Sequence, residues 1–140
     1  MILVFSCSAF CATTQEVKQN IIRQSKAMGV DPAIMLSIAK AESGFRQEAK
    51  AGNNIGVFQL STHIAKTMGI NPYDLDDNIK GGIVYYKNMY NKFGSMELAV
   101  AAYNTGAGAI TRNGNTVPSY ARPFVNRIMN NYKSFKQTGL

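Results

Sequence analysis

The sequence predicts an α-helical protein with one compact domain, and three observations lead to that prediction. Hydrophobic residues make up 46% of the 140 residues, which is enough for the core of a single domain. Apolar residues recur at helical spacing between Gly, Asn and Pro turns, and β-alternation of any length is missing. Residues 47–60 are rich in Gly and Asn, so we expect a small irregular or hairpin region there.

The first twelve residues differ from the rest because they carry no charge and are mostly apolar or small. The stretch is too short to span a bilayer as a helix and is typical of the apolar part and cleavage end of a secretory signal. Although a positive leading region is missing, we expect a signal peptide over residues 1–12, cleaved near Ala9 to Ala12, and a mature domain over 13–140. A lipid anchor at Cys7 is a weaker alternative, because LVFSC matches a lipobox poorly. We expect a periplasmic or secreted protein.

Both cysteines, Cys7 and Cys11, lie within this predicted signal. The mature domain would then contain no disulfide, thiol nucleophile or cysteine metal site. The single histidine, His63, follows Ser61 on a predicted helix and lacks the partners that a zinc site or a Ser-His-Asp triad needs. We therefore expect neither a metal nor a cofactor.

Most of the predicted helices begin at a capping side chain, and most end at a glycine. The helices with such signals are residues 13–29 (Thr13 or Thr14, then Gly29), 31–44 (Asp31 with Pro32, then Gly44), 61–69 (Ser61, then Gly69), 78–94 (ending at Gly94) and 95–106 (Ser95, then Gly106).

Three segments complete this map of elements. The longest helix, residues 78–94, carries Ile79, Ile83, Tyr86 and Tyr90 at helical spacing. The segment NPYDLDD before it, residues 71–77, is expected to form a turn. AGAITRNG follows the helix over residues 95–106, and SYARPFVNRIMNNYKSF predicts a closing helix.

The net charge of +7 predicts attraction to a polyanion such as a cell wall, with a merely solvated basic surface as the alternative. Lys and Arg residues are scattered along the chain and form neither a dense cluster nor a known nucleic-acid motif. Readers of nucleic acid usually show a basic stripe or such a motif, so we expect no nucleic-acid partner.

Glu42 is a carboxylic acid on a helix face that is otherwise aliphatic. It follows Ile34 and Ile38 at intervals of four residues and lies in the last predicted turn. Burial beside Ile38 and the negative end of the helix dipole both disfavour the ionised form, so both raise its pKa. A carboxyl group that is protonated near neutral pH can act as a general acid. The alternative is an exposed glutamate at a frayed helix end.

Glu42 belongs to the first of three short segments that together form a recognisable sequence pattern. They are ESGF (42–45), GVFQLS (56–61) and AAYNTGAGAI (101–110). In this order they resemble the soluble (Slt) type of lytic transglycosylase, a relative of goose-type lysozyme. Its catalytic glutamate matches Glu42, and its Gly-x-Met-Gln and Ala-Tyr-Asn-Ala-Gly-x-Gly patterns match the other two segments. The resemblance runs from about Val17 to Tyr132 and implies a helical, lysozyme-like fold.

The resemblance also implies an activity. The substrate would be peptidoglycan, cleaved between N-acetylmuramic acid and N-acetylglucosamine, with Glu42 protonating the β-1,4 glycosidic oxygen. The resulting carboxylate would deprotonate the C6 hydroxyl of the muramoyl residue, whose attack on C1 gives a 1,6-anhydro end. Most glycosidases use two carboxylates, whereas this family uses one and draws on the acetamido group of the substrate.

Five further site residues follow from the matched segments. The Tyr103 hydroxyl is expected near the acid, with Asn104 beside it. Gln59 is expected to hydrogen-bond sugar hydroxyls or acetamido groups. Phe58 stands where the family has methionine and is expected to offer an apolar wall to a sugar ring. Gly56 lies in a loop that could approach a ligand closely.

Two alternatives stay open, a hydrolytic muramidase and a non-catalytic wall-binding module. The muramidase would need a second acid, and Glu48 is the nearest candidate. The other carboxylates have different expected places: Asp31 caps a helix, Glu97 lies in a first helical turn, and Asp74, Asp76 and Asp77 fall in the turn over residues 71–77.

The chain departs from the family pattern at two places. The loop between the first two segments is short, with Ala51 near the place of a family serine. Tyr120 and Phe124 stand where the family has glutamate and tyrosine, so a substrate contact from that segment is not assured. The small size resembles specialised transglycosylases, and we expect a monomer that acts on glycan strands, with a type III or type IV secretion or conjugation machine as partner.

Overall fold

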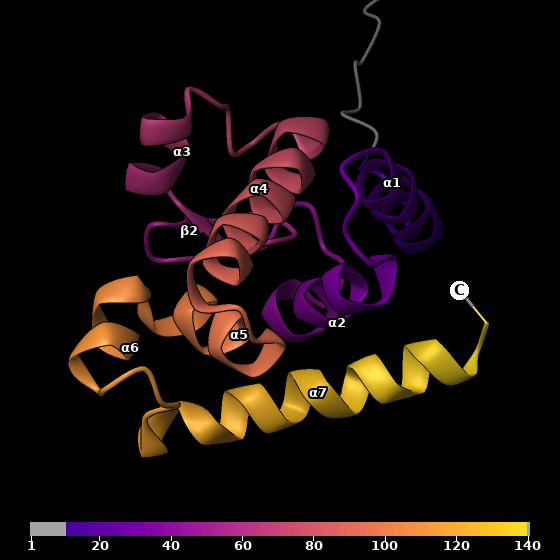
Figure 1. Ribbon diagram of the computed structural model, residues 1–140. Helices are drawn as coiled ribbons and strands as arrows, with labels where there is room; N and C mark the ends of the chain where they lie inside the picture. Colours follow the sequence, from indigo (N-terminus) through magenta and orange to yellow (C-terminus); the bar gives the residue numbers. More distant parts are fainter. Residues whose placement is uncertain (1–10, 140) are drawn as a thin grey trace, which may run out of the picture.

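The computed structural model describes residues 11–139, in which seven α-helices pack with one three-stranded sheet (Figure 1). This confirms the predicted helical class and the hairpin region. The predicted signal peptide, apart from Cys11 and Ala12, lies outside the described residues. The elements in chain order are α1 (Thr14–Ala27), α2 (Pro32–Ser43), β1 (Lys50–Ala51), β2 (Asn54–Ile55), β3 (Leu60–Ser61), α3 (Thr62–Met68), α4 (Leu75–Phe93), α5 (Met96–Thr105), α6 (Ala107–Arg112), a 3-10 turn (Ser119–Ala121) and α7 (Arg122–Gln137).

The helix ends follow the predicted capping chemistry. Thr13 caps α1 by accepting from the Glu16 amide at 3.2 Å, and the Glu16 carboxylate accepts from the Thr13 amide at 2.8 Å. Asp31 caps α2 through the Ala33 amide at 2.9 Å. Gly44 ends α2 with φ 61°, a backbone conformation that side chains with a Cβ rarely adopt. Local hydrogen bonding therefore fixes where α1 and α2 begin and where α2 ends.

Helix α4 corrects the expected turn over residues 71–77. Asp74 caps it by accepting from the Asp77 amide at 2.9 Å, and the helix already begins at Leu75. Asp76 and Asp77 thus lie in its first turn, where the helix dipole favours carboxylates. At its other end Tyr90 is 44% exposed, so the buried stripe of α4 stops before that residue.

The sheet is small and antiparallel, in the order β1-β2-β3. Lys50 pairs with Ile55, and Ile55 pairs in turn with Leu60. The Ile55 and Leu60 side chains are buried, as is Phe45 after α2, so all three belong to the core. The sheet therefore anchors the loop of residues 56–59 between α2 and α4.

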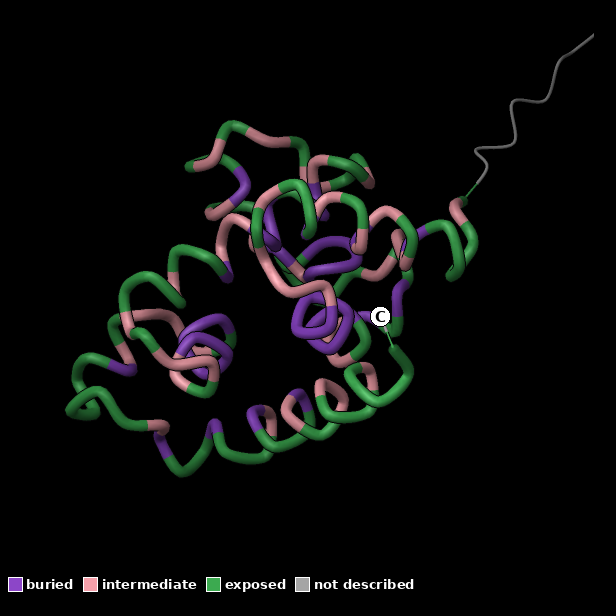
Figure 2. Tube along the Cα trace, turned by 45° about the vertical axis from the view of Figure 1, so that its right-hand side comes forward, coloured by how far each residue is buried: buried purple, intermediate pink, exposed green. Residues whose placement is uncertain are grey.

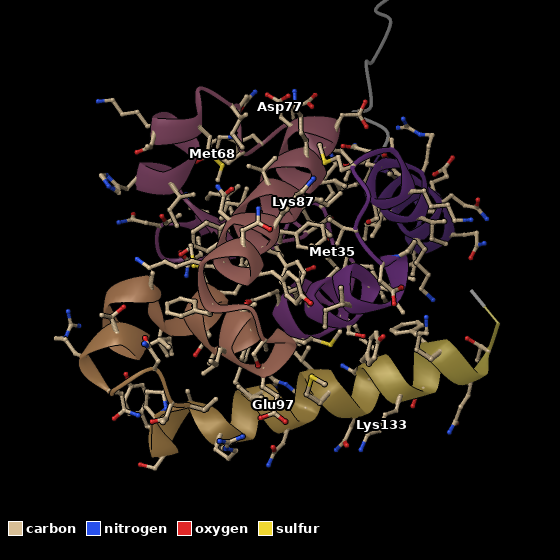
Figure 3. The ribbon with its side chains drawn as sticks, in the orientation of Figure 1. Met35, Met68, Asp77, Lys87, Glu97 and Lys133 are labelled. Carbon is tan, nitrogen blue, oxygen red and sulfur yellow. The ribbon has the colours of Figure 1, made fainter. Side chains whose placement is uncertain are left out.

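Helix α2 lies at the centre of the core. Ile34, Met35 and Ile38 are at most 1% exposed, and Figure 3 shows Met35 in the middle of the molecule. Helix α7 packs across α2 and α5 with Val125 and Ile128 fully buried. Figure 2 shows buried residues concentrated centrally and only along the inner side of α7. Burying one such aliphatic side chain contributes about 1.5–3 kcal/mol, so this packing holds the end of α2 in place.

A close approach between the sheet loop and α4 depends on glycine. A Cβ at Gly82 would clash with the Phe58 ring, which is itself fully buried. Glycine in mid-helix costs about 0.5–1 kcal/mol relative to alanine, and here it allows Phe58 to reach the core. Within residues 11–139, the helices include none that combines the length and the apolar character needed to cross a membrane.

Candidate active site

A cavity of about 310 Å³ opens where the end of α2, the sheet, α4 and α5 meet. Within residues 11–139, Glu42 is the only charged side chain in its lining, and all other lining residues are uncharged. The lining consists of Glu42, Asn54, Gln59, Leu60, Ser61, Ile64, Tyr85, Tyr103, Asn104, Thr105 and Gly106. The cavity thus combines one carboxyl group with several neutral hydrogen-bonding groups and a few apolar side chains.

Glu42 occupies the last turn of α2 and is partly buried. Burial raises the pKa of its carboxyl from 4.5 to about 7, while the positive charge of Arg127 acts in the opposite direction. Ion pairs within 4 Å occur elsewhere in the described chain, but none involves Glu42. A large fraction of this side chain therefore carries a proton near neutral pH, as a general acid requires.

The next residue, Ser43, fixes the end of α2 to the loop of residues 56–59. Its buried hydroxyl donates to the Val57 carbonyl oxygen at 2.8 Å and accepts from the Arg46 amide at 3.2 Å. A hydrogen bond between segments fourteen residues apart resists shear between them. Ser43, the residue after Glu42, therefore holds the end of α2 in a fixed position relative to the loop that carries Gln59.

Gln59 has a backbone φ of 47°, which is uncommon for a residue with a Cβ. Its side-chain amide donates to the Ala49 carbonyl at 3.2 Å and to the Gly56 carbonyl at 2.9 Å. Both amide hydrogens are thus used within the loop, and Oε1 is left as an acceptor. Gln59 can therefore recognise a ligand N–H or O–H, but not a ligand carbonyl.

Tyr103 lies in α5 beside the acid. Its hydroxyl is buried and donates to the Phe58 carbonyl at 2.8 Å. Because the hydroxyl has one proton, only its lone pairs are available to other groups. Burial, followed by the charges of Glu42 and Tyr85, raises the pKa of Tyr103 well above its ordinary value. A neutral tyrosine whose proton points elsewhere favours the protonated form of Glu42 over the carboxylate.

Asn104 and Thr105 complete the end of α5. Asn104 is exposed and lines the cavity, so its amide is available to a ligand. The Thr105 hydroxyl donates to the Ala101 carbonyl at 2.9 Å, so its lone pairs remain as acceptors. The structure thus brings Glu42, Gln59, Asn104 and the Tyr103 side chain around one cavity, as the sequence predicts.

Phe58 and Gly56 do not line this cavity. The Phe58 side chain is fully buried in the core against Gly82, so the expectation that its ring forms a wall for a sugar is wrong. Only its backbone carbonyl serves the site, as the acceptor for Tyr103. Gly56 is buried with φ 78°, and a Cβ there would lie 2.5 Å from the Asn78 amide nitrogen. It makes room for Asn78, rather than for a ligand.

Asn78 is a positioning residue that the sequence analysis missed. Its buried amide donates to the Ile55 carbonyl at 2.8 Å and to the Pro72 carbonyl at 2.9 Å, and its oxygen accepts from the Phe58 amide at 2.9 Å. It therefore clamps the loop that carries Gln59 onto α4. An Asn in a first helical turn gives no local signal of this role, because its partners lie up to 23 residues away.

Tyr85 is a second residue that the sequence analysis missed. It lines the cavity and packs edge-on against Tyr103, with ring centroids 5.0 Å apart. Its neighbour Tyr86 belongs to the predicted apolar face of α4, whereas Tyr85 lies outside that pattern. Tyr85 could have been found from the sequence as an aromatic residue of this helix that does not lie on its predicted apolar face.

Other candidates from the sequence lie elsewhere. Glu48 is exposed, accepts from the Cys11 thiol at 3.3 Å and lines a different cavity, so it does not share a site with Glu42. Tyr120 is 70% exposed, and Phe124 carries the Arg127 guanidinium over its ring; neither lines the cavity. Residues 11–139 contain no group of three or more His, Cys, Asp or Glu side chains placed to hold a metal ion.

Comparison with protein families gives one match over most of the chain. A family model described as transglycosylase SLT domain matches residues 19–123. The membrane-bound lytic murein transglycosylase C of Mannheimia succiniciproducens is 30% identical over 78% of this chain and 37% of the relative. A transglycosylase of Enterobacteria phage PRD1 is 29% identical over 59% of this chain and 32% of the relative. The chain thus spans about a third of the length of these relatives.

Solved structures share the fold at lower identity. An inactive mutant of the lytic transglycosylase Slt from Pseudomonas aeruginosa superposes with a TM-score of 0.74 and 21% identity, over 86% of this chain and 24% of that one. The 70 kDa soluble lytic transglycosylase of Escherichia coli gives 0.70 and 24%, over 84% and 24%. A complex of a 70 kDa soluble lytic transglycosylase with bulgecin A gives 0.73 and 20%, over 86% and 24%. These likenesses establish the lysozyme-like fold.

Proposed function

The chain belongs to the transglycosylase SLT domain family, and from that premise we propose that it is a peptidoglycan lytic transglycosylase in which Glu42 acts as both acid and base. The observation that carries this proposal is the partly buried Glu42, with a pKa of about 7, in a cavity whose other lining residues are uncharged. That arrangement supports a mechanism of two proton transfers, first from Glu42 and then back to it.

In the first step, protonated Glu42 donates its proton to the β-1,4 glycosidic oxygen between N-acetylmuramic acid and N-acetylglucosamine. The C1–O bond of the muramoyl residue breaks, and the leaving strand departs with a neutral hydroxyl. Positive charge develops at C1 and the ring oxygen, as in other glycosidase transition states. The acetamido group of the substrate stabilises that centre, so a second carboxylate from the protein is not required.

In the second step, Glu42 is a carboxylate and takes the proton of the muramoyl C6 hydroxyl. The C6 oxygen bonds to C1 and closes the 1,6-anhydro ring, while Glu42 regains the proton that it lost. The cycle consumes no water and leaves Glu42 as it began. A pKa near 7 suits both halves, because the group must give a proton and then take one at the same pH.

Substrate recognition follows from the free hydrogen-bonding groups. Gln59 Oε1 accepts from an acetamido N–H or a sugar hydroxyl, since its own amide hydrogens are used within the loop. The exposed amide of Asn104 supplies both a donor and an acceptor at the other rim. These neutral groups fit a neutral glycan backbone and leave Glu42 as the one carboxyl group that faces it within the described chain.

Product analysis tests the proposal. Purified sacculi treated with the protein should release muropeptides with 1,6-anhydromuramoyl ends, detected by mass spectrometry, and Glu42→Gln should release at least about 10²-fold less. Reducing ends without anhydro products would make the protein a hydrolytic muramidase. Unchanged sacculi with wild-type protein that still binds them would make it a wall-binding module.

We further propose that the enzyme acts in the periplasm or outside the cell. Its proposed substrate lies there, and residues 1–12 resemble a secretory signal. Sequencing the N-terminus of the exported protein should find it near residues 10–13, and a retained Met1 would remove this support.

A partnership with a type III or type IV secretion or conjugation machine stays a prediction from the family resemblance. It is tested by measuring lytic activity and location with and without assembly of such a machine. If neither changes, the predicted partnership has no support.

A further inference from the structure

A cavity of about 400 Å³ opens where α1, α2 and the C-terminal half of α7 meet, and we call it the α7 cavity. In Figure 1, the C-terminal end of α7 extends past α2 on the side of the molecule where α1 lies. The α7 cavity shares no lining residue with the cavity of Glu42, so a ligand in it would not occupy the proposed site of cleavage. Its apolar lining consists of Ile22, Leu36 and the Phe135 ring.

Two lysine ammonium groups give the α7 cavity a positive charge. Lys18 on α1 and Lys40 on α2 both line it, and within the described chain no acidic side chain does. The Lys18 Nζ lies 4.9 Å from the centroid of the Phe45 ring, and the Lys40 Nζ lies 5.8 Å from that of Phe135. An aromatic face attracts an ammonium group without neutralising its charge. The two rings therefore favour these positions and leave both charges for a ligand.

Neither ammonium group is paired with a carboxylate of the described residues. The ion pairs within residues 11–139 involve other side chains. Glu16, the acidic residue nearest to Lys18 in the sequence, accepts from the Thr13 amide at 2.8 Å in the cap of α1. The α7 cavity thus carries two positive charges without a compensating negative one. Coulomb attraction then favours an anion there over a cation or a neutral ligand.

Neutral hydrogen-bonding groups surround the two ammonium groups. The side-chain amides of Gln15 and Gln19 and the hydroxyls of Ser134 and Thr138 line the α7 cavity. The Thr138 hydroxyl donates to the Phe135 carbonyl at 2.8 Å, so its lone pairs remain as acceptors. Each glutamine amide offers a donor and an acceptor, which match the C=O and N–H of a peptide group. An inorganic phosphate would leave these acceptors and the apolar lining unused.

We propose that the α7 cavity binds an acidic stem peptide of peptidoglycan, with the Lys18 and Lys40 ammonium groups each donating to a carboxylate. Stem peptides are short, carry several carboxylates and include small apolar residues such as alanine. They therefore match the two cations, the amides and the apolar lining together. The inference rests on the proposed function, which brings the domain to a polymer that carries many such peptides.

The α7 cavity has a consequence for action on an insoluble wall. Each exposed ion pair contributes little in water, so a free stem peptide binds weakly. On the wall the peptides are joined to the glycan, and a strand held at Glu42 keeps neighbouring peptides near the domain at a high effective concentration. The α7 cavity thus retains the enzyme on peptide-bearing wall between cleavage events.

The first test is a titration of 15N-labelled Glu42→Gln protein with the N-acetylated stem tripeptide L-Ala-γ-D-Glu-meso-diaminopimelate. We expect amide shifts at Gln19, Lys40 and Ser134 that weaken as salt is added, because exposed ion pairs are screened. The same tripeptide with its carboxyl groups amidated is the matched control and should give no shifts at these residues. Lys18→Gln combined with Lys40→Gln should weaken tripeptide binding by about 3- to 10-fold, as expected for the loss of two exposed ion pairs.

The second test measures binding to intact sacculi by co-sedimentation in the Glu42→Gln background. Lys18→Gln combined with Lys40→Gln should reduce this binding several-fold. Lys26→Gln combined with Lys80→Gln is the matched control, because it removes the same net charge at exposed positions that line neither cavity. This control variant should bind as its parent does.

Equal losses of sacculus binding in the two double variants would assign the attraction to net charge and overturn the inference. Equal shifts with the amidated tripeptide, or the same shifts with inorganic phosphate at the same concentration, would also overturn it. So would the absence of tripeptide shifts; if binding to phosphatidylglycerol vesicles then depended on Lys18 and Lys40, the α7 cavity would be a lipid headgroup site. Cleavage of sacculi by wild-type protein tests the proposed function separately, because neither binding experiment requires cleavage.

Discussion

The two ends of α2 carry two carboxyl groups with opposite properties. At the N-terminus, burial raises the pKa of Asp31, but hydrogen bonds from the Ala33 amide, Lys136 and Tyr132 outweigh it and lower the pKa overall. At the C-terminus, burial raises the pKa of Glu42 to about 7, and only the charge of Arg127 opposes it. The two ends of one helix thus lower the pKa of one carboxyl group and raise the pKa of the other, so that Glu42 still carries a proton in a large fraction of molecules near neutral pH.

The comparison shows how the fold assigns roles to similar side chains. Asp31 meets the positive end of the helix dipole and three donors, so its charge is useful for stability. Glu42 meets the negative end, an apolar stripe and a tyrosine whose proton is used elsewhere. The carboxylate of Asp31 is structural, whereas Glu42 keeps a transferable proton.

The largest expected effect is on catalysis by Glu42. Glu42→Gln keeps the shape but removes the transferable proton, so glycan cleavage should fall by about 10²- to 10⁴-fold or more. Release of anhydro-muropeptides from sacculi measures it. Glu97→Gln is the matched control, because Glu97 lies in the first turn of α5 and pairs at the surface with Arg122 at 3.1 Å. Full lysis by Glu42→Gln would remove Glu42 from the mechanism.

The next largest effect concerns Asn78, whose hydrogen bonds attach the loop that carries Gln59 to α4. Asn78→Ala leaves the Phe58 amide and two carbonyls without their partner, so the free energy of unfolding should fall by about 2–4 kcal/mol. Denaturant unfolding measures it, with Asn126→Ala on the exposed side of α7 as the control.

A merely structural role for Asn78 would lower stability without changing the kinetics of the folded fraction. A positioning role predicts that kcat/KM per folded molecule also falls, because the loop carrying Gln59 loses its attachment to α4. Unchanged kcat/KM would restrict Asn78 to stability.

The third prediction concerns the pH dependence of stability. Because the folded pKa of Glu42 lies near 7, above the unfolded value near 4.5, its effect on stability is fully present below pH 4.5 and is lost as the pH rises through 7. Glu42→Gln, which never ionises, should therefore gain stability relative to wild type across that window, by at most about 3 kcal/mol. Thermal unfolding between pH 4 and pH 8 measures it.

The contribution of Asp31 to stability should depend on pH in the opposite direction. Its folded pKa is lowered, so its contribution is present above the unfolded value and is lost as the pH falls through the folded one. A stability difference between wild type and Glu42→Gln that does not change between pH 4 and pH 8 would contradict the contrast between the two ends of α2.

The smallest predicted effect isolates Arg127. Its positive charge lowers the pKa of Glu42, so Arg127→Met should raise that pKa further. The alkaline limb of the kcat/KM profile should then move to higher pH by a few tenths of a unit, a typical size for an exposed charge. Lys133→Met, which removes another exposed charge from α7, is the control. A shift to lower pH would contradict the assigned interaction.

Local chemistry made much of the fold predictable from sequence. Caps such as Thr13 and Asp31 and the stop at Gly44 depend on residues within one turn, and all three are confirmed. The expected turn over residues 71–77 forms only at residues 71–74, because Asp74 caps a helix that begins at Leu75. Capping potential in that segment favoured the helix over the turn.

In the site, too, the residues with local or family signals could be predicted from the sequence, whereas those that depend on distant contacts could not. Glu42 stands out by its position on α2, and the family segments placed Gln59, Tyr103 and Asn104, which the structure gathers around one cavity. The burial of Phe58 depends on Gly82, and the clamp of Asn78 on the sheet loop, both about twenty residues away. Such contacts leave no periodic signal in the sequence.

The most direct test of the account is the pKa of Glu42 itself. A 13C NMR titration of the glutamate side-chain carboxyls, with Glu42→Gln to assign the signal, measures it in the folded protein. We predict a midpoint near pH 7. A midpoint near the ordinary value of about 4.5 would mean that the cavity does not hold the proton on Glu42, and the proposed acid catalysis would lose its physical basis.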